Sequence, residues 1–124
     1  NLRFEPRQEG NRRWVWDRSH PERREWSVEL GSPAAPGTRT SRRDYAIISR
    51  LLPSRTDRPV LMLAGLTGFG TSTAAEFVSD PAFLSRLGAS AAAGWQEKNL
   101  QVVIETEVID AHAGPPRVLA IHVW

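Results

Sequence analysis

The chain has 124 residues, 40% hydrophobic and 24% charged, which is typical of one globular domain rather than a disordered chain. It contains no cysteine, and this excludes disulfide scaffolds, cysteine-based zinc sites and thiol catalysis. The net charge of +2 conceals an asymmetry, because residues 1–58 carry 13 arginines against 8 acids while residues 59–124 carry 3 basic residues against 6 acids. The arginines are interleaved with acids, so we interpret the basic half as a solvated surface and disfavour nucleic acid as a partner.

We expect residues 1–124 to form a single domain that is a fragment of a longer protein, because the chain begins without methionine and is polar and strand-like from its first residues. The longest apolar run, residues 59–66, is far shorter than the roughly 20 residues that cross a bilayer. We therefore expect no membrane span in this segment and a cytoplasmic location, with a membrane tether outside the segment as an open alternative.

The first 30 residues predict a β-hairpin or meander. Residues 12–17 alternate, with Trp14 and Trp16 on one face, and residues 25–30 alternate again after a turn at residues 19–21. Beside the neighbouring arginines, the two tryptophans could stack against a base or a sugar, pack one face of a sheet, or form a dimer interface.

The centre of the chain predicts a loop and two strands. Residues 31–38 are rich in glycine and proline and form a loop by composition, while residues 54–59 form a charged turn. Residues 45–52 predict a strand. Residues 60–64 are continuously apolar, which is typical of a strand covered on both faces. A glycine-rich turn follows this second strand.

Two short helices are predicted after the turn. Thr73 and Glu76 match a capping box, so we expect the first helix to begin with Thr73 as its N-cap. Asp80 and Pro81 predict the start of the second. The second helix is expected to end at Gly88 and to bury a stripe formed by Phe83, Leu84 and Leu87.

The C-terminal residues predict a β-hairpin. Residues 100–109 form a long strand, and residues 117–124 return after a short connection that requires antiparallel pairing. The order of strands, two helices and a hairpin predicts an α/β fold class, with α+β as the alternative. We expect a mixed sheet in two or three layers, with two short helices after the glycine-rich turn and a C-terminal β-hairpin.

The glycine-rich turn is the strongest candidate for a ligand site, because a helix N-terminus offers N–H groups and partial positive charge to an anion at the end of a strand. It lacks the Gly-Lys-Ser/Thr ending of a Walker A loop, and no suitably spaced acidic residue completes a dinucleotide fingerprint. A strand-to-helix turn that needs glycine for steric reasons is the simpler alternative. The residues that would bind a small anionic ligand are Gly65, Thr67, Gly68, Gly70, Thr71, Ser72 and Thr73.

The remaining chemistry-bearing groups predict no catalytic residue, cofactor or metal site. Asp110, His112 and His122 could approach one another across the final hairpin, but surface polar residues and a partly buried His122 are the simpler interpretation. Glu105 and Glu107 lie two apart on one face of a strand, which does not place carboxylates across a substrate cleft. We lean towards a protein that is not an enzyme.

Four blocks, at residues 44–51, 60–71, 74–81 and 98–103, resemble an uncharacterised bacterial domain. In that group, similar blocks lie near the C-terminus of longer proteins, sometimes behind a DNA-binding or other regulatory module. The likeness covers roughly residues 44–124, with a looser match in residues 1–26. It implies a sensor or accessory role beside other domains of the parent protein, and it brings no catalytic residue.

We therefore expect a non-enzymatic module of a larger bacterial regulatory protein, which senses a small ligand or mediates association. Two alternatives stay open at this point. One is a nucleotide-dependent enzyme fragment with an anion site at the glycine-rich turn. The other is a homodimerisation domain that uses the tryptophan face or the edge of the final strand.

Overall fold

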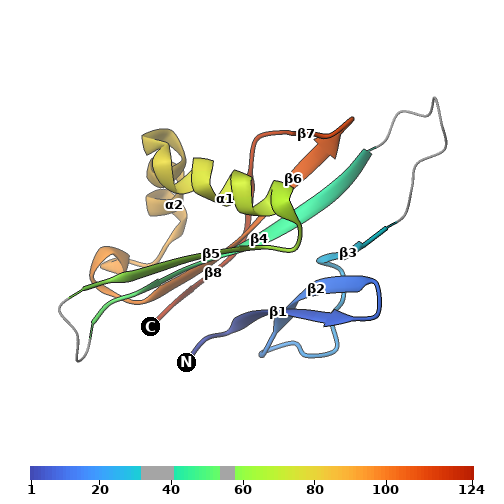
Figure 1. Ribbon diagram of the computed structural model, residues 1–124. Helices are drawn as coiled ribbons and strands as arrows, with labels where there is room; N and C mark the ends of the chain where they lie inside the picture. Colours follow the sequence, from blue (N-terminus) through green and yellow to red (C-terminus); the bar gives the residue numbers. More distant parts are fainter. Residues whose placement is uncertain (32–40, 54–57) are drawn as a thin grey trace.

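A computed structural model describes residues 1–31, 41–53 and 58–124, which form three layers (Figure 1). A five-stranded sheet lies in the middle, two helices cover one of its faces, and a three-stranded sheet from the first 30 residues covers the other. Every strand pair among the described residues is antiparallel. The predicted fold class is thus confirmed in its α+β form, and the described strands include none of the parallel pairs of a mixed sheet.

The N-terminal sheet is the predicted meander. It contains β1 (Phe4–Glu9), β2 (Arg12–Asp17) and β3 (Ser27–Glu29), paired in that order. Its inner face supplies Phe4 and Val15 to a core cluster shared with the central sheet. Trp14 and Trp16 alternate with Val15 and lie on the opposite face of the strand, so the face that packs against the central sheet is not the tryptophan face.

The central sheet is ordered around its two longest strands. β4 (Ser41–Leu51) pairs with β5 (Val60–Gly65) on one side and with β6 (Leu100–Ile109) on the other. Both β7 (His112–Ala113) and β8 (Arg117–Val123) pair with the far side of β6. The predicted C-terminal hairpin is confirmed as the antiparallel pair of β6 and β8.

The two long strands are apolar on both faces because each face is covered by a different layer. Successive side chains of a strand point to opposite faces, so alternate residues enter different clusters. The cluster under the helices contains Ala46, Ile48, Val102 and Ile104. The cluster under the N-terminal sheet contains Tyr45, Ile47 and Val103.

Two helices, α1 (Gly68–Ser79) and α2 (Pro81–Ser90), cover the other face, followed by a 3₁₀ turn at Trp95–Glu97. The predicted start of the second helix is confirmed, because the Asp80 carboxylate accepts a hydrogen bond from the N–H of Ala82. The predicted stop at Gly88 is wrong, since α2 continues to Ser90. The predicted buried stripe is only partly correct, because Leu87 is buried while Leu84 is 36% exposed.

Two expectations about the centre of the chain are wrong. α1 begins after an N-cap at Thr67, not at Thr73. The apolar strand β5 is not covered on both faces, because it lies at the end of the sheet with Val60, Leu61 and Met62 49%, 52% and 41% exposed. The reason is topological: β6 occupies one side of β4, so the hairpin from β4 places β5 on the open side.

Three sequence predictions concern the connections and the membrane. Most of the loop at residues 31–38 and most of the charged turn at residues 54–59 lie outside the described residues. Within the part of the chain that the structure describes, no helix is long and apolar enough to cross a membrane.

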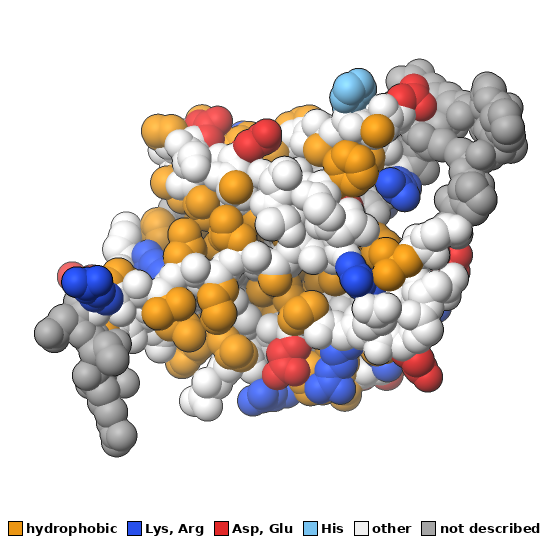
Figure 2. All heavy atoms as spheres, in the orientation of Figure 1, with side chains coloured by type: hydrophobic (Ala, Val, Ile, Leu, Met, Phe, Trp, Pro, Cys, Tyr) orange, Lys and Arg blue, Asp and Glu red, His pale blue; other side chains and the backbone are white. Residues whose placement is uncertain are grey.

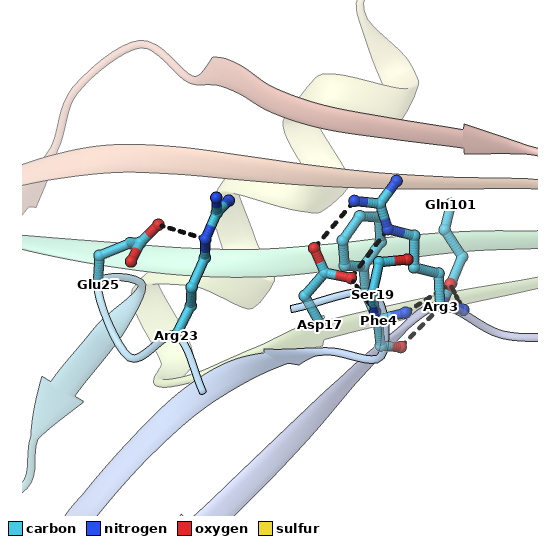
Figure 3. A network of polar contacts seen from close by, with 7 residues as sticks. All are labelled: Arg3, Phe4, Asp17, Ser19, Arg23, Glu25 and Gln101. Carbon is cyan, nitrogen blue, oxygen red and sulfur yellow. Dashed lines mark hydrogen bonds and ion pairs between the residues drawn. The ribbon is translucent and has the colours of Figure 1, made fainter. Parts of the chain in front are cut away.

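A buried glutamine joins the N-terminal sheet to the central sheet (Figure 3). Gln101 Oε1 accepts hydrogen bonds from the backbone N–H groups of Arg3 and Phe4 at 2.8 and 2.9 Å, and its Nε2 donates to Phe4 O and Ser49 Oγ at 2.9 and 3.0 Å. Beside it, the Arg3 guanidinium donates to both carboxylate oxygens of Asp17 at 2.9 Å. This contact holds the pKa of the Asp17 carboxyl below its ordinary value, so the pair stays charged at neutral pH.

We expect Gln101→Leu to lower the free energy of unfolding by about 2–4 kcal/mol, because it leaves the backbone N–H groups of Arg3 and Phe4 without an acceptor and an unsatisfied buried group costs roughly 1–3 kcal/mol. The exposed Gln96→Leu is the matched control and should stay within about 0.5 kcal/mol of the wild type. Urea unfolding followed by tryptophan fluorescence measures both. Equal stabilities for the two variants would contradict this role of Gln101.

Candidate functional site

The glycine-rich turn between β5 and α1 is built around the carboxylate of Asp44, a β4 residue that is 2% exposed. Its Oδ2 accepts hydrogen bonds from the Gly70 N–H at 2.7 Å and from the Thr67 hydroxyl, and its Oδ1 accepts from the Tyr45 N–H at 2.8 Å. Thr67 Oγ1 in turn accepts from the N–H of Phe69 at 3.3 Å. α1 therefore begins at this turn because the Asp44 carboxylate satisfies the N–H of Gly70, and Thr67, which the same carboxylate holds, satisfies that of Phe69.

Two glycines of the turn are required by close packing. A Cβ at Gly70 would lie 2.5 Å from the carbonyl oxygen of Tyr45, and a Cβ at Gly65 would lie 2.2 Å from the backbone nitrogen of Thr71. At Gly68, by contrast, a Cβ would meet nothing within 4 Å. The steric explanation of the glycines therefore accounts for Gly65 and Gly70.

The structure brings only part of the predicted anion site together. Gly65 is held to the first turn of α1, since its N–H donates to Thr71 Oγ1 at 3.1 Å. Ser72 is exposed. Thr73 is 1% exposed and lies further along the helix, where its Oγ1 has no hydrogen-bond partner among the described residues.

The electrostatics of the turn disfavour an anion. Two of the donors expected to bind a ligand, the buried Gly70 N–H and the Thr67 hydroxyl, already donate hydrogen bonds to Asp44 Oδ2. A second negative charge at the same helix end would meet the charge of that carboxylate at short range. The anion site stays a prediction, and it would have to rely on the exposed residues Gly68 and Ser72.

An open groove of about 540 Å³ lies near the C-terminal end of β6. Its charged lining mixes both signs, and the Arg117 guanidinium lies 2.9 Å from Glu105 Oε1. The other charged groups of its lining are Arg43 and Glu107. Glutamates and arginines side by side give no field of a single sign, so the groove does not select an ion by charge.

The histidines do not meet. His112 pairs with Ile109 and His122 pairs with Gln101, which places the two histidines at opposite ends of β6, on the order of 25 Å apart at the usual rise of a strand. His122 stacks on the ring of Trp124 with centroids 4.8 Å apart. In residues 1–31, 41–53 and 58–124, no group of three histidines, cysteines or acids could hold a metal ion.

Trp14 and Trp16 are each covered by an arginine from the first 30 residues. The Arg7 guanidinium lies 3.8 Å from the ring centroid of Trp16, and that of Arg24 lies 4.7 Å from Trp14, which is 7% exposed. A base or a sugar would have to displace these cation–π contacts before it could stack on either ring.

The outer side of β5 is the candidate surface that sequence reasoning missed. Its first three residues are large, apolar and exposed, and no charge occurs between Val60 and Gly65. Figure 2 shows hydrophobic side chains gathered over this part of the molecule, while charged side chains lie along the N-terminal sheet below. Monomeric proteins normally protect such an edge with charge, proline or a bulge.

Backbone pairing shows which groups of β5 point outward. The Leu66 N–H donates to Tyr45 O at 2.8 Å, and antiparallel pairing alternates along a strand. The backbone groups of Val60, Met62 and Ala64, which alternate back from Leu66, therefore form hydrogen bonds with β4. The residues between them, Leu61, Leu63 and Gly65, point their N–H and C=O groups away from β4, and among the described residues no strand lies on that side.

The unpaired section of this edge is short and well bounded. At one end the Gly65 N–H is already bonded to Thr71 Oγ1. At the other end stands Pro59, which has no N–H. The complete pairs of donor and acceptor on the outer edge are therefore those of Leu61 and Leu63.

Comparison with known proteins identifies no relative: no family model, no curated protein and no solved structure matches the chain. The resemblance to a bacterial C-terminal domain therefore stays a prediction.

The packing of the turn predicts different effects for two neighbouring glycines. Gly70→Ala should lower the free energy of unfolding by about 2–3 kcal/mol, because its Cβ would overlap the backbone of β4. Gly68→Ala should be neutral or slightly stabilising, because its Cβ has open space and alanine favours a helix. Thermal denaturation followed by circular dichroism measures both, and a Gly68→Ala variant less stable than Gly70→Ala would contradict this packing.

Proposed function

We propose that this domain is a non-enzymatic interaction module that binds an extended apolar segment by adding it as a strand to β5. The observation that supports the proposal is the outer edge of β5, where Leu61 and Leu63 direct backbone N–H and C=O groups outward on an exposed, uncharged strand. Added strands are recognised through such main-chain groups, and the flanking side chains supply apolar contact.

The other described strand edges contrast with β5. β1 carries Pro6 and the charged residues Glu5, Arg7 and Glu9, which oppose the addition of another strand. β3 and β7 are only three and two residues long. β8 contains Arg117 and has an irregular register opposite Val103 and Ile104. β5 combines length, regular pairing and absence of charge, so it is the edge best suited to a partner strand.

The sensing of a small anion and a nucleotide-dependent enzyme fragment are weaker proposals. Both place an anion at the turn, where Asp44 holds the Gly70 N–H and the Thr67 hydroxyl. The wider expectation of a regulatory module in a larger bacterial protein is compatible with strand addition, which is one recurring way for a domain to recognise another polypeptide segment.

The test uses a fluorescein-labelled peptide of alternating valine and threonine with lysines at both ends, titrated with dilute protein and followed by anisotropy. We expect the wild type to bind it and Leu61→Pro to bind at least about tenfold more weakly, because proline removes an outward N–H that β4 does not use. Leu61→Thr keeps that N–H and should bind nearly as the wild type does.

Absence of peptide binding by the wild type, or equal binding by Leu61→Pro, would overturn the proposal. A thermal-shift screen of nucleotides, sugars and acidic metabolites tests the alternative site. Stabilisation that Gly68→Val abolishes would favour the turn, since Gly68 has room for a side chain and the variant should still fold.

A further inference from the structure

We infer that the strand which pairs with β5 is β5 of a second copy of this chain, in a two-fold antiparallel register centred on Met62. This inference rests on the proposed strand addition and names its partner. In this register Leu61 lies opposite Leu63 of the second copy and Leu63 lies opposite its Leu61. Both pairs exchange N–H···O bonds, so the complete donor and acceptor pairs of each edge meet those of the other.

Neighbouring two-fold registers make as many N–H···O bonds, but each leaves a C=O group of Leu61 or Leu63 without a donor. A register centred on Leu61 places Leu63 opposite Pro59, which has no N–H to donate. A register centred on Leu63 places Leu61 opposite Gly65, whose N–H is already bonded to Thr71 Oγ1. The register centred on Met62 is therefore the one that pairs every N–H and C=O group of Leu61 and Leu63.

The side chains also suit pairing of identical strands. Residues 60–66 carry no charge, so two copies do not repel one another along the strand. The register sets Val60 opposite Ala64, a large residue against a small one, and brings the two Met62 side chains together in a pair that makes no hydrogen bonds, with Cα atoms about 4.5 Å apart. Met62 is 41% exposed in one copy, and its flexible side chain can adapt to this contact.

The two-fold axis of such a pair is perpendicular to the sheet. The sheet then continues from one copy into the other, with both helical layers on the same face. The contact is confined to one strand of six residues from each copy, which is small for a permanent dimer. We therefore expect a weak dimer that forms as the protein concentration rises.

Substitution of Met62 by charges of opposite sign tests both the partner and the register. Sedimentation equilibrium of the 124-residue chain should show a dimer for the wild type and monomers for Met62→Lys and Met62→Glu, because like charges would meet at the axis. An equimolar mixture of the two variants should recover the dimer, since opposite charges then meet. Leu84→Lys, which places a lysine at another exposed apolar position, should dimerise as the wild type does.

A wild type that stays monomeric at millimolar concentration would overturn the inference, as would a dimer that both Met62 variants retain or a mixture that stays monomeric. Circular dichroism establishes that each variant is folded. Leu61→Pro, which loses an outward N–H without adding charge, is the second variant and should also be monomeric. If the wild type is monomeric but binds the valine–threonine peptide, strand addition stands and the partner is a different chain; if it does neither, both proposals fail.

Discussion

The buried carboxylate of Asp44 is the contact on which the centre of this structure depends. It lies on β4 and accepts hydrogen bonds from the Gly70 N–H and the Thr67 hydroxyl, so it joins the central sheet to the first turn of α1. A buried carboxylate without such donors would be strongly unfavourable, and a buried helix end without an acceptor would also cost free energy. The start of α1 supplies donors to the buried carboxylate, and the carboxylate supplies an acceptor to the helix start. The contact needs a close approach of the two backbones, which accounts for the glycine at position 70.

The same contact changes where function is expected. A strand end, a glycine-rich turn and a helix N-terminus are the usual elements of an anion site, but here the protein supplies the anion itself. The hydrogen-bonding capacity that the fold leaves unused lies elsewhere, on the outer edge of β5. Leu61 and Leu63 present it on a strand whose apolar side chains extend beyond the covering layers. Exposed apolar surface and unpaired main-chain groups favour the same kind of partner, an added strand.

A second buried polar group holds the outer layer in place. Gln101 lies in the otherwise apolar start of β6 and binds main-chain groups of Arg3 and Phe4. Main-chain groups of a strand that packs against a sheet face need partners when they are buried, and a single amide can supply both an acceptor and a donor. Asp44 and Gln101 thus act at opposite faces of the central sheet, one fixing α1 and the other the N-terminal sheet.

Local patterns in the sequence predicted those elements whose causes are local. The predicted strand at residues 100–109 agrees with β6, because alternation and β-branched residues continue to its ends. Asp80 and Pro81 predicted the start of α2 because capping acts over a few residues. Each of these signals lies within the element that it predicts.

Contacts between distant residues caused the errors. Thr73 and Glu76 match a capping box, but Asp44, 26 residues before Gly70, determines where α1 begins. The continuous apolar run of β5 has the same composition as a central strand, and only the order of strands in the sheet shows that it is an edge. Pro59, just before the run, is a local signal in the sequence: it has no N–H and therefore ends the unpaired section of the outer edge.

Amide hydrogen exchange of β5, followed residue by residue by NMR at several protein concentrations, is the most direct test of this account. Met62 and Ala64 should exchange slowly at every concentration, because their N–H groups bond β4. Leu61 and Leu63 should exchange rapidly in dilute protein and become protected as the concentration rises. Rapid exchange of Leu61 and Leu63 at every concentration, or their protection already in dilute protein, would contradict an open edge that pairs with a second copy.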